Sequence, residues 1–163
     1  MSGLEVRPVR PEEYAAVTAL TLEVYVGGGY IPADDYYVAE LSAPATRADE
    51  ADVLVAVEDG AVLGAVTYCP LGSTWREIAA EDEGEFRMLA VSGAARGRGV
   101  GLALVQACLD QAREAGLRGL AISTMSKMTE AHRLYGRLGF ARVPDSDWSP
   151  QSGVCLMAFR LRF

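Results

Sequence analysis

The sequence predicts one domain of mixed α and β structure, of α+β or α/β class, over residues 1–163. Three observations support this prediction. A length of 163 residues suits a single domain with a core of its own. Half of the residues are hydrophobic and 23% are charged, which is the balance of a folded chain. Segments with strand patterns also alternate with helical stripes along the chain.

Strands are predicted where apolar residues alternate or run together between turn signals. Pro8 fits an edge strand or the end of a strand for the first of these, because proline donates no N–H to a sheet. Asp59 and Gly60 form a two-residue turn that joins the second and third strands into a hairpin. The predicted strands are Leu4–Val9, Val53–Glu58, Ala61–Cys69, Glu85–Val91, Leu117–Thr124, Phe140–Val143 and Val154–Arg160.

Helices are predicted where apolar residues recur every three or four positions and a glycine follows. The first opens at Pro11, with two acids at its positive end, and stops at Gly27–Gly29. Residues 30–52 are irregular apart from a short helix at about 34–41. Two later apolar stripes predict helices that end at Gly116 and Gly139. The first stripe consists of Leu102, Val105, Cys108, Leu109 and Ala112, and the second of Ala131, Leu134, Tyr135 and Leu138.

Charge and cysteine content limit the partners. The formal net charge of −7 argues against nucleic acid, because phosphate binding needs a surplus of cations. The three cysteines have no metal-site or disulfide spacing, and we interpret them as small hydrophobes in a reducing compartment. With a single histidine, His132, no metal site is expected. We interpret His132 as a partly exposed and structurally idle residue, with a catalytic histidine as the alternative.

No targeting or membrane signal is expected. The longest apolar runs are far shorter than the roughly 20 residues of a spanning helix. The first residues lack the basic-then-apolar layout of a signal peptide. The sequence therefore predicts a cytoplasmic protein without a membrane partner.

The segment Arg96–Gly101 lies between a predicted strand and a predicted helix. Glycines allow close backbone approach, and N–H groups at a helix start attract anions, so this turn suits a phosphate. A glycine-rich loop in solvent is the plainer interpretation. A dinucleotide fingerprint is incomplete here, and a P-loop is excluded because no Gly-Lys-Ser/Thr follows.

The turn has the form Arg-x-x-Gly-x-Gly and follows the strand Phe86–Val91. Together they resemble the pyrophosphate-binding motif of the GNAT superfamily of acyl-CoA-dependent N-acyltransferases. Residues 131–140, a helix with Leu-Tyr that ends in Gly-Phe, resemble that family's second signature. The resemblance implies a mostly antiparallel sheet, flanked by helices and splayed between the fourth and fifth strands. It also implies transfer of an acetyl group from acetyl-CoA to a primary amine by direct attack, without a metal.

The resemblance implies roles for particular residues. The cofactor would be held by Leu89, Ala90, Val91, Arg96, Gly97, Arg98, Gly99, Val100 and Gly101. Tyr135 would protonate the departing thiolate, although its place in an apolar stripe also fits a core residue. Glu85 would be the general base, with Glu83 and Glu81 as reserves and a solvated acidic loop as the plainer interpretation. Met128 stands where the family often has an asparagine.

The acceptor stays open at this point. A small-molecule amine or a peptide amine is expected, bound by the loops 27–47, 69–83 and 144–153. These regions and the neighbouring Tyr25 supply aromatic and acidic residues that suit a cation: Tyr25, Tyr30, Tyr36, Tyr37, Trp75, Trp148, Asp34, Asp35, Glu81 and Glu83. A non-catalytic acyl-CoA-binding or regulatory module is the alternative function, and a homodimer is left open.

Overall fold

The computed structural model describes residues 3–150 and 155–163. The strands in these ranges are β1 (Glu5–Pro8), β2 (Asp52–Glu58), β3 (Ala61–Cys69), β4 (Glu83–Val91), β5 (Gly119–Met125), β6 (Ala141–Arg142) and β7 (Leu156–Arg162). The α-helices are α1 (Tyr14–Tyr25), α2 (Tyr37–Leu41), α3 (Pro44–Glu50), α4 (Val100–Glu114) and α5 (Thr129–Arg137). Short 3-10 turns lie at Pro11–Glu13, Gly93–Ala95 and Pro144–Ser146.

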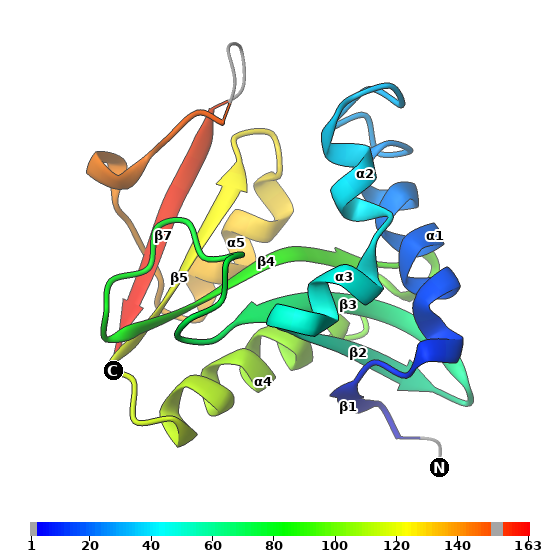
Figure 1. The fold of residues 1–163 in the computed structure, drawn as a ribbon, viewed down its shortest axis with the longest axis horizontal. Helices are drawn as coiled ribbons and strands as arrows, with labels where there is room; N and C mark the ends of the chain where they lie inside the picture. The colour runs from blue at the N-terminus through cyan, green and yellow to red at the C-terminus, as the bar shows by residue number, and fades with distance from the viewer. Residues whose placement is uncertain (1–2, 151–154) are drawn as a thin grey trace.

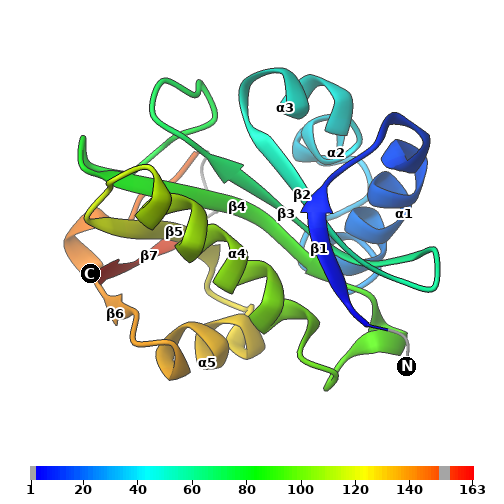
Figure 2. The ribbon, with the colours of Figure 1, turned by 90° about the horizontal axis from the view of Figure 1, so that it is seen from below.

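The strands form one sheet in the order β1-β2-β3-β4-β5-β7-β6. Strands β4 and β5 are parallel, and the other neighbours are antiparallel. Helices α1, α2 and α3 lie on one face of the β1–β4 half, and α4 lies on the other (Figures 1 and 2). The predicted class, a mixed and mostly antiparallel sheet flanked by helices, is confirmed.

Both faces of the sheet bury a core. In β2, Leu54 packs into the cluster on the α4 side, whereas Val55 packs into the cluster on the α1 side. Helix α4 approaches β3 closely at Gly64, where a Cβ would lie 2.7 Å from a methyl carbon of Val100. A side chain at this position would therefore push the start of α4 away from the sheet.

Most predicted elements are confirmed within a few residues, and α3 is the exception. The sequence predicts irregular structure there, but Pro44 opens a helix that carries Arg47, which is only 1% exposed. The Arg47 guanidinium donates to Thr67 Oγ1 and to the carbonyl oxygen of Glu40, which ties α3 to β3 and α2. The predicted last strand starts at Leu156, while Val154 lies outside the described residues.

Strands β4 and β5 separate where the resemblance implies a splay. Their pairing runs from Glu83 opposite Gly119 to Phe86 opposite Ile122. Strand β4 continues to Val91 and β5 to Met125 without further pairing between them. Figure 1 shows the two strands diverging, with α5 close to β5. The β5-facing edge of β4 from residue 87 onward is therefore free of strand partners, and the predicted splay is confirmed.

A bulge in β4 changes which side chains face the splay. The register with β3 shifts between Ala65 and Thr67, and Met88 on the opposite strand has a φ of 57°. Phe86 faces the α4 side of the sheet, but Met88 faces the α1 side. The consecutive residues Arg87 and Met88 consequently line the same cavity. Among the described residues, no helix is long and apolar enough to cross a membrane.

Candidate active site

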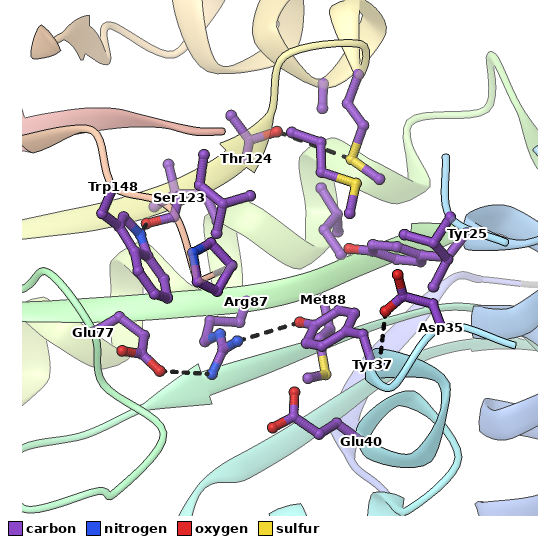
Figure 3. Close-up of a pocket in the computed structure, with 18 of the residues that line it drawn as sticks. Tyr25, Asp35, Tyr37, Glu40, Glu77, Arg87, Met88, Ser123, Thr124 and Trp148 are labelled. Carbon is purple, nitrogen blue, oxygen red and sulfur yellow. Dashed lines mark hydrogen bonds and ion pairs between the residues drawn. The ribbon is translucent and has the colours of Figure 1, made fainter. Parts of the chain in front are cut away.

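A cavity of about 240 Å³ lies where β4 leaves β5, and we call it the splay cavity. Its wall comes from β4, β5, α1, α2, α5 and the loops that cover them (Figure 3). Most of the wall is aromatic or apolar, with a few polar groups. The aromatic members are Tyr25, Tyr36, Tyr37, Tyr135 and Trp148, and the charged ones are Asp35, Glu40, Glu77 and Arg87.

A larger groove runs between the start of α4 and α5, and we call it the α4 groove. Leu89, Met128 and Ala131 line both the α4 groove and the splay cavity. The two spaces therefore meet at Leu89, on the free edge of β4. Val91 also lines the groove, but Ala90 lines neither space and is buried on the α1 side of the sheet.

Unpaired backbone N–H groups gather at the start of α4. Gly97 and Gly99 have φ values of 80° and 78°, so both favour glycine. Ala103 is the first residue of α4 whose N–H bonds back to the turn, to the Gly99 carbonyl oxygen. Among the described residues, no partner is found for the N–H groups of the α4 amide cluster, which comprises Gly97, Gly99, Val100, Gly101 and Leu102. This cluster, at the positive end of a 15-residue helix, suits a diphosphate.

The arginines near the α4 amide cluster differ in placement. Arg96 lines the α4 groove, and its Nη1 lies 3.2 Å from Glu130 Oε2. Arg98 does not line it: its Nη2 lies 2.7 Å from Glu58 Oε2 on β2. Arg133 and Arg137 line the groove instead, and sequence reasoning missed them. Their spacing of four residues on one helix face is the signal that could have found them.

Replacing Glu130 by glutamine is expected to tighten acetyl-CoA binding about two- to threefold. The carboxylate at the groove repels phosphate and occupies Arg96, but both side chains are exposed, so the effect is small and screened by salt. Isothermal titration at low and high salt measures it. Glu114→Gln, at the far end of α4, is the matched control. Weaker binding by Glu130→Gln would contradict the placement of the phosphates.

Tyr135 lies at the inner wall of the splay cavity and is 2% exposed. Its ring packs against Phe86, Phe140 and Phe159, with centroids 5.7, 5.8 and 5.9 Å away. Among the described residues, no hydrogen-bond partner of its hydroxyl is found. Burial raises the pKa of Tyr135, so the phenol keeps its proton throughout the neutral range. The Tyr135 ring therefore belongs to the hydrophobic core, and the same residue also lines the splay cavity.

Glu85 is fully buried and does not itself line the splay cavity. Its Oε1 accepts the backbone N–H groups of Glu77, Ile78 and Ala79 at 3.0, 2.9 and 2.9 Å. Its Oε2 has no partner among the described residues. Burial raises the pKa of Glu85, and the three N–H donors act against that shift. Glu85 therefore holds the loop that brings Glu77 to the cavity.

The reserve carboxylates lie elsewhere. Glu83 is 1% exposed and its Oε1 lies 3.0 Å from Arg160 Nε, so it belongs to an ion pair between β4 and β7. Glu81 is exposed on the loop before β4 and does not line the cavity. The cavity carboxylates that sequence reasoning missed are Glu40 and Glu77. A signal for Arg87 was present, because it is the charged residue within the otherwise apolar run Phe86–Val91.

The ring of His132 contacts the end of β5. Its Nε2 lies 3.0 Å from the Met125 carbonyl oxygen and 3.3 Å from Thr124 Oγ1, so the ring connects α5 to the end of β5. Burial lowers the pKa of His132, which favours the neutral ring. The expectation of a structurally idle histidine is therefore wrong, because the His132 ring makes these contacts and also packs against Phe159.

Comparison with known proteins identifies the class. The fold is that of acyl-CoA-dependent acetyltransferases, and the sequence matches the Acetyltransferase (GNAT) family over residues 16–140. The chain belongs to this family.

Three relatives illustrate the likeness. A mycothiol acetyltransferase of Cellulomonas flavigena is 38% identical over 118 residues, which cover 67% of this chain and 34% of that protein. The chain thus spans about a third of that relative's length. The structure of a GCN5-related N-acetyltransferase from Kribbella flavida is 26% identical, covers 98% of both chains and has a TM-score of 0.71. A GNAT acetyltransferase from Brucella melitensis, solved with acetyl-CoA, is 25% identical with a TM-score of 0.66, covering 99% of this chain and 88% of that one.

Proposed function

We propose that this protein transfers an acetyl group from acetyl-CoA to a primary amine that binds in the splay cavity. The observation that carries the proposal is the meeting of the splay cavity and the α4 groove at Leu89. A donor in the groove and an acceptor in the cavity would place their reacting groups side by side there. The N-acetyltransferase from Kribbella flavida and the acetyl-CoA complex from Brucella melitensis support the same reaction class.

The residues of the α4 groove fit acetyl-CoA. The α4 amide cluster supplies N–H groups for its diphosphate, and Arg96 adds a cation. The free edge of β4 at Leu89 and Val91 offers backbone groups to the amide-containing arm. When bound, acetyl-CoA supplies an acetyl group activated as a thioester. An N–H near Leu89 would donate to the thioester oxygen, where negative charge grows as the amine attacks.

Two side chains of this chain would move protons. Tyr135 would donate its phenol proton to the departing sulfur, which its place on the cavity wall and its raised pKa support. Glu85 would take the proton of the amine through a bridging water, which its unpartnered Oε2 supports. An alkyl ammonium has a pKa of about 10.4, so some group must accept its proton before attack. Direct attack needs no acyl-enzyme, and the buried thiol of Cys69 does not line the cavity.

Thiol release in the presence of acetyl-CoA and a panel of primary amines tests the proposal. We expect release that depends on the amine and stops when its nitrogen is dimethylated. Acetyl-CoA alone is expected to raise the melting temperature by several degrees, because it binds the folded state. Stabilisation without thiol release from any amine would contradict catalysis and favour an acyl-CoA-binding module. Absence of stabilisation at millimolar acetyl-CoA would contradict the α4 groove as its site.

A further inference from the structure

Arg87 is a buried guanidinium with incomplete partners. It contributes a cation to the wall of the splay cavity, and its side chain is 11% exposed. Among the described residues its polar contacts are a hydrogen bond of 3.2 Å to the Trp75 carbonyl oxygen and longer contacts of 3.3 Å to Tyr37 Oη and 3.6 Å to Glu77 Oε1. Figure 3 shows the guanidinium between Glu77 and Tyr37. A charge buried this far normally has a close, well-aligned counterion.

Other arginines of the same protein show what a completed pair looks like. Each uses two nitrogens on the two oxygens of one carboxylate, the geometry that suits a guanidinium best. The distances are 2.9 and 2.7 Å for Arg7 with Glu13, 2.6 and 2.5 Å for Arg142 with Asp147, and 3.0 and 2.8 Å for Arg162 with Asp82. Among the described residues Arg87 has no such partner: the carboxylate of Glu77 is held at 3.6 Å by a loop, and that of Glu85 makes no hydrogen bond or ion pair with Arg87.

The backbone of Glu77 explains why it does not complete the pair. Its N–H donates to Glu85 Oε1, which fixes the loop in place, and its side chain is 36% exposed to solvent. The ring faces of Trp75 and Tyr37 lie 5.8 and 6.0 Å from the guanidinium and limit its movement. The guanidinium is therefore held in position, with room on the cavity side for a ligand.

The cavity also presents negative charge. Asp35 and Glu40 line it, and no partner of the Glu40 carboxylate is found among the described residues. A molecule with cations at both ends would place one of them near Arg87 and be repelled. A molecule with one amine and one carboxylate would satisfy both kinds of charge in the wall.

From these contacts we infer that the acceptor is a small amino acid whose carboxylate binds Arg87 while its amine faces Leu89. This inference rests on the proposed function. Arg87 and Leu89 are two residues apart on β4, with the bulge residue Met88 between them, so their Cα atoms are separated by at most about 7 Å. The amine and carboxylate of one small molecule can span that separation, given the length of the arginine side chain. A cavity of about 240 Å³ also favours a compact acceptor over a large one.

Matched pairs of acceptors test the inference. Each pair consists of an amino acid and its carboxamide, and a diamine is included. Rates are compared at equal concentrations of free amine, because the carboxamide lowers the pKa of the neighbouring amine. The kcat/KM measured by thiol release should be roughly 10- to 100-fold higher for the acids than for the amides. This is the contribution expected from a hydrogen bond to a charged group. The diamine should react no faster than the amides. Equal rates for acids and amides, or faster reaction of the diamine, would overturn the inference while leaving the proposed function standing.

Arg87→Lys distinguishes recognition from a structural role of the same side chain. It keeps the positive charge but loses the two-pronged geometry, so the preference for acids should fall to within about threefold, mainly through KM. If Arg87 only supported the packing of the loop, the substitution would lower kcat/KM for acids and for amides equally. An unchanged preference for acids would therefore contradict the inference. Arg7→Lys is the matched control, because Arg7 has a two-pronged pair on β1 and does not line the cavity. If no amine in the panel reacts, the proposed function itself fails, and acetyl-CoA stabilisation then reports separately on the α4 groove.

Discussion

Replacing Tyr135 by phenylalanine is expected to lower kcat about 100- to 1,000-fold while leaving KM for acetyl-CoA nearly unchanged. The substitution removes the phenol proton proposed for the departing thiolate, and general acid catalysis contributes on this scale. The ring remains and keeps its contacts with Phe86, Phe140 and Phe159, so the free energy of unfolding should change by less than about 1 kcal/mol. Steady-state thiol release and thermal unfolding measure the two quantities.

The chain offers a matched control at Tyr68. This tyrosine is also buried, and its hydroxyl also has no partner among the described residues, but it does not line the splay cavity. Tyr68→Phe should therefore keep wild-type kcat. Equal kcat in the two variants would contradict the acid role of Tyr135.

The pH profile gives a second check of the acid role. Burial raises the pKa of Tyr135, so the proton that the reaction needs is lost only at strongly alkaline pH. The wild-type enzyme should show no decline in kcat from this group between pH 7 and about 10. A decline of kcat just above neutral pH that is absent from Tyr135→Phe would contradict this expectation, because the pKa of Tyr135 would then lie near neutrality instead of being raised.

The sequence predicted the parts of the site that depend on backbone and spacing. The glycines of residues 96–101 and the helix after them predict a turn with free N–H groups, and the structure has such groups at the start of α4. The position of Tyr135 in its helical stripe likewise predicts a buried ring. These inferences are local, so a linear sequence was sufficient for them.

The parts that sequence reasoning missed depend on pairing between distant segments. The bulge at Met88 exists only in register with β3, and it places Arg87 and Met88 in the same cavity. Arg98 is separated from the groove by its ion pair with Glu58, 40 residues earlier. Helix α3 depends on the burial of Arg47 against β3, which no local pattern reveals. The positions of these side chains are set by tertiary contacts, so the spacing of residues along the sequence does not predict them.

Replacing Glu85 by alanine is expected to lower the free energy of unfolding by about 2–3 kcal/mol. Three backbone N–H groups, of Glu77, Ile78 and Ala79, would lose their acceptor, and partly buried donors without partners are costly. Glu85→Gln keeps an oxygen for these donors and should cost less than about 1 kcal/mol. Chemical denaturation of the two variants measures the difference. Equal stability of both would contradict the role of Glu85 in holding the loop.

The pH dependence of that stability has a defined sign. Because burial raises the pKa of Glu85, folding favours its protonated form. The stabilising contribution of the protonated carboxyl is present below the unfolded pKa and is lost as pH rises through the folded pKa. Wild-type protein therefore carries a cost at neutral pH that the neutral amide of Glu85→Gln avoids. The destabilisation by Glu85→Gln should accordingly be smaller at pH 8 than at pH 4.

The same glutamine variant separates the two functions assigned to Glu85. The amide oxygen still accepts the loop N–H groups, but it cannot take a proton from the attacking amine. A base role predicts that kcat falls about 100-fold while the melting temperature stays close to that of the wild type. Wild-type kcat with a normal melting temperature would contradict the base role, because the loop would then be the whole contribution of this side chain. Glu77→Gln is the companion variant, since Glu77 lines the cavity directly; a greater loss of kcat there than in Glu85→Gln would assign the proton to Glu77 instead.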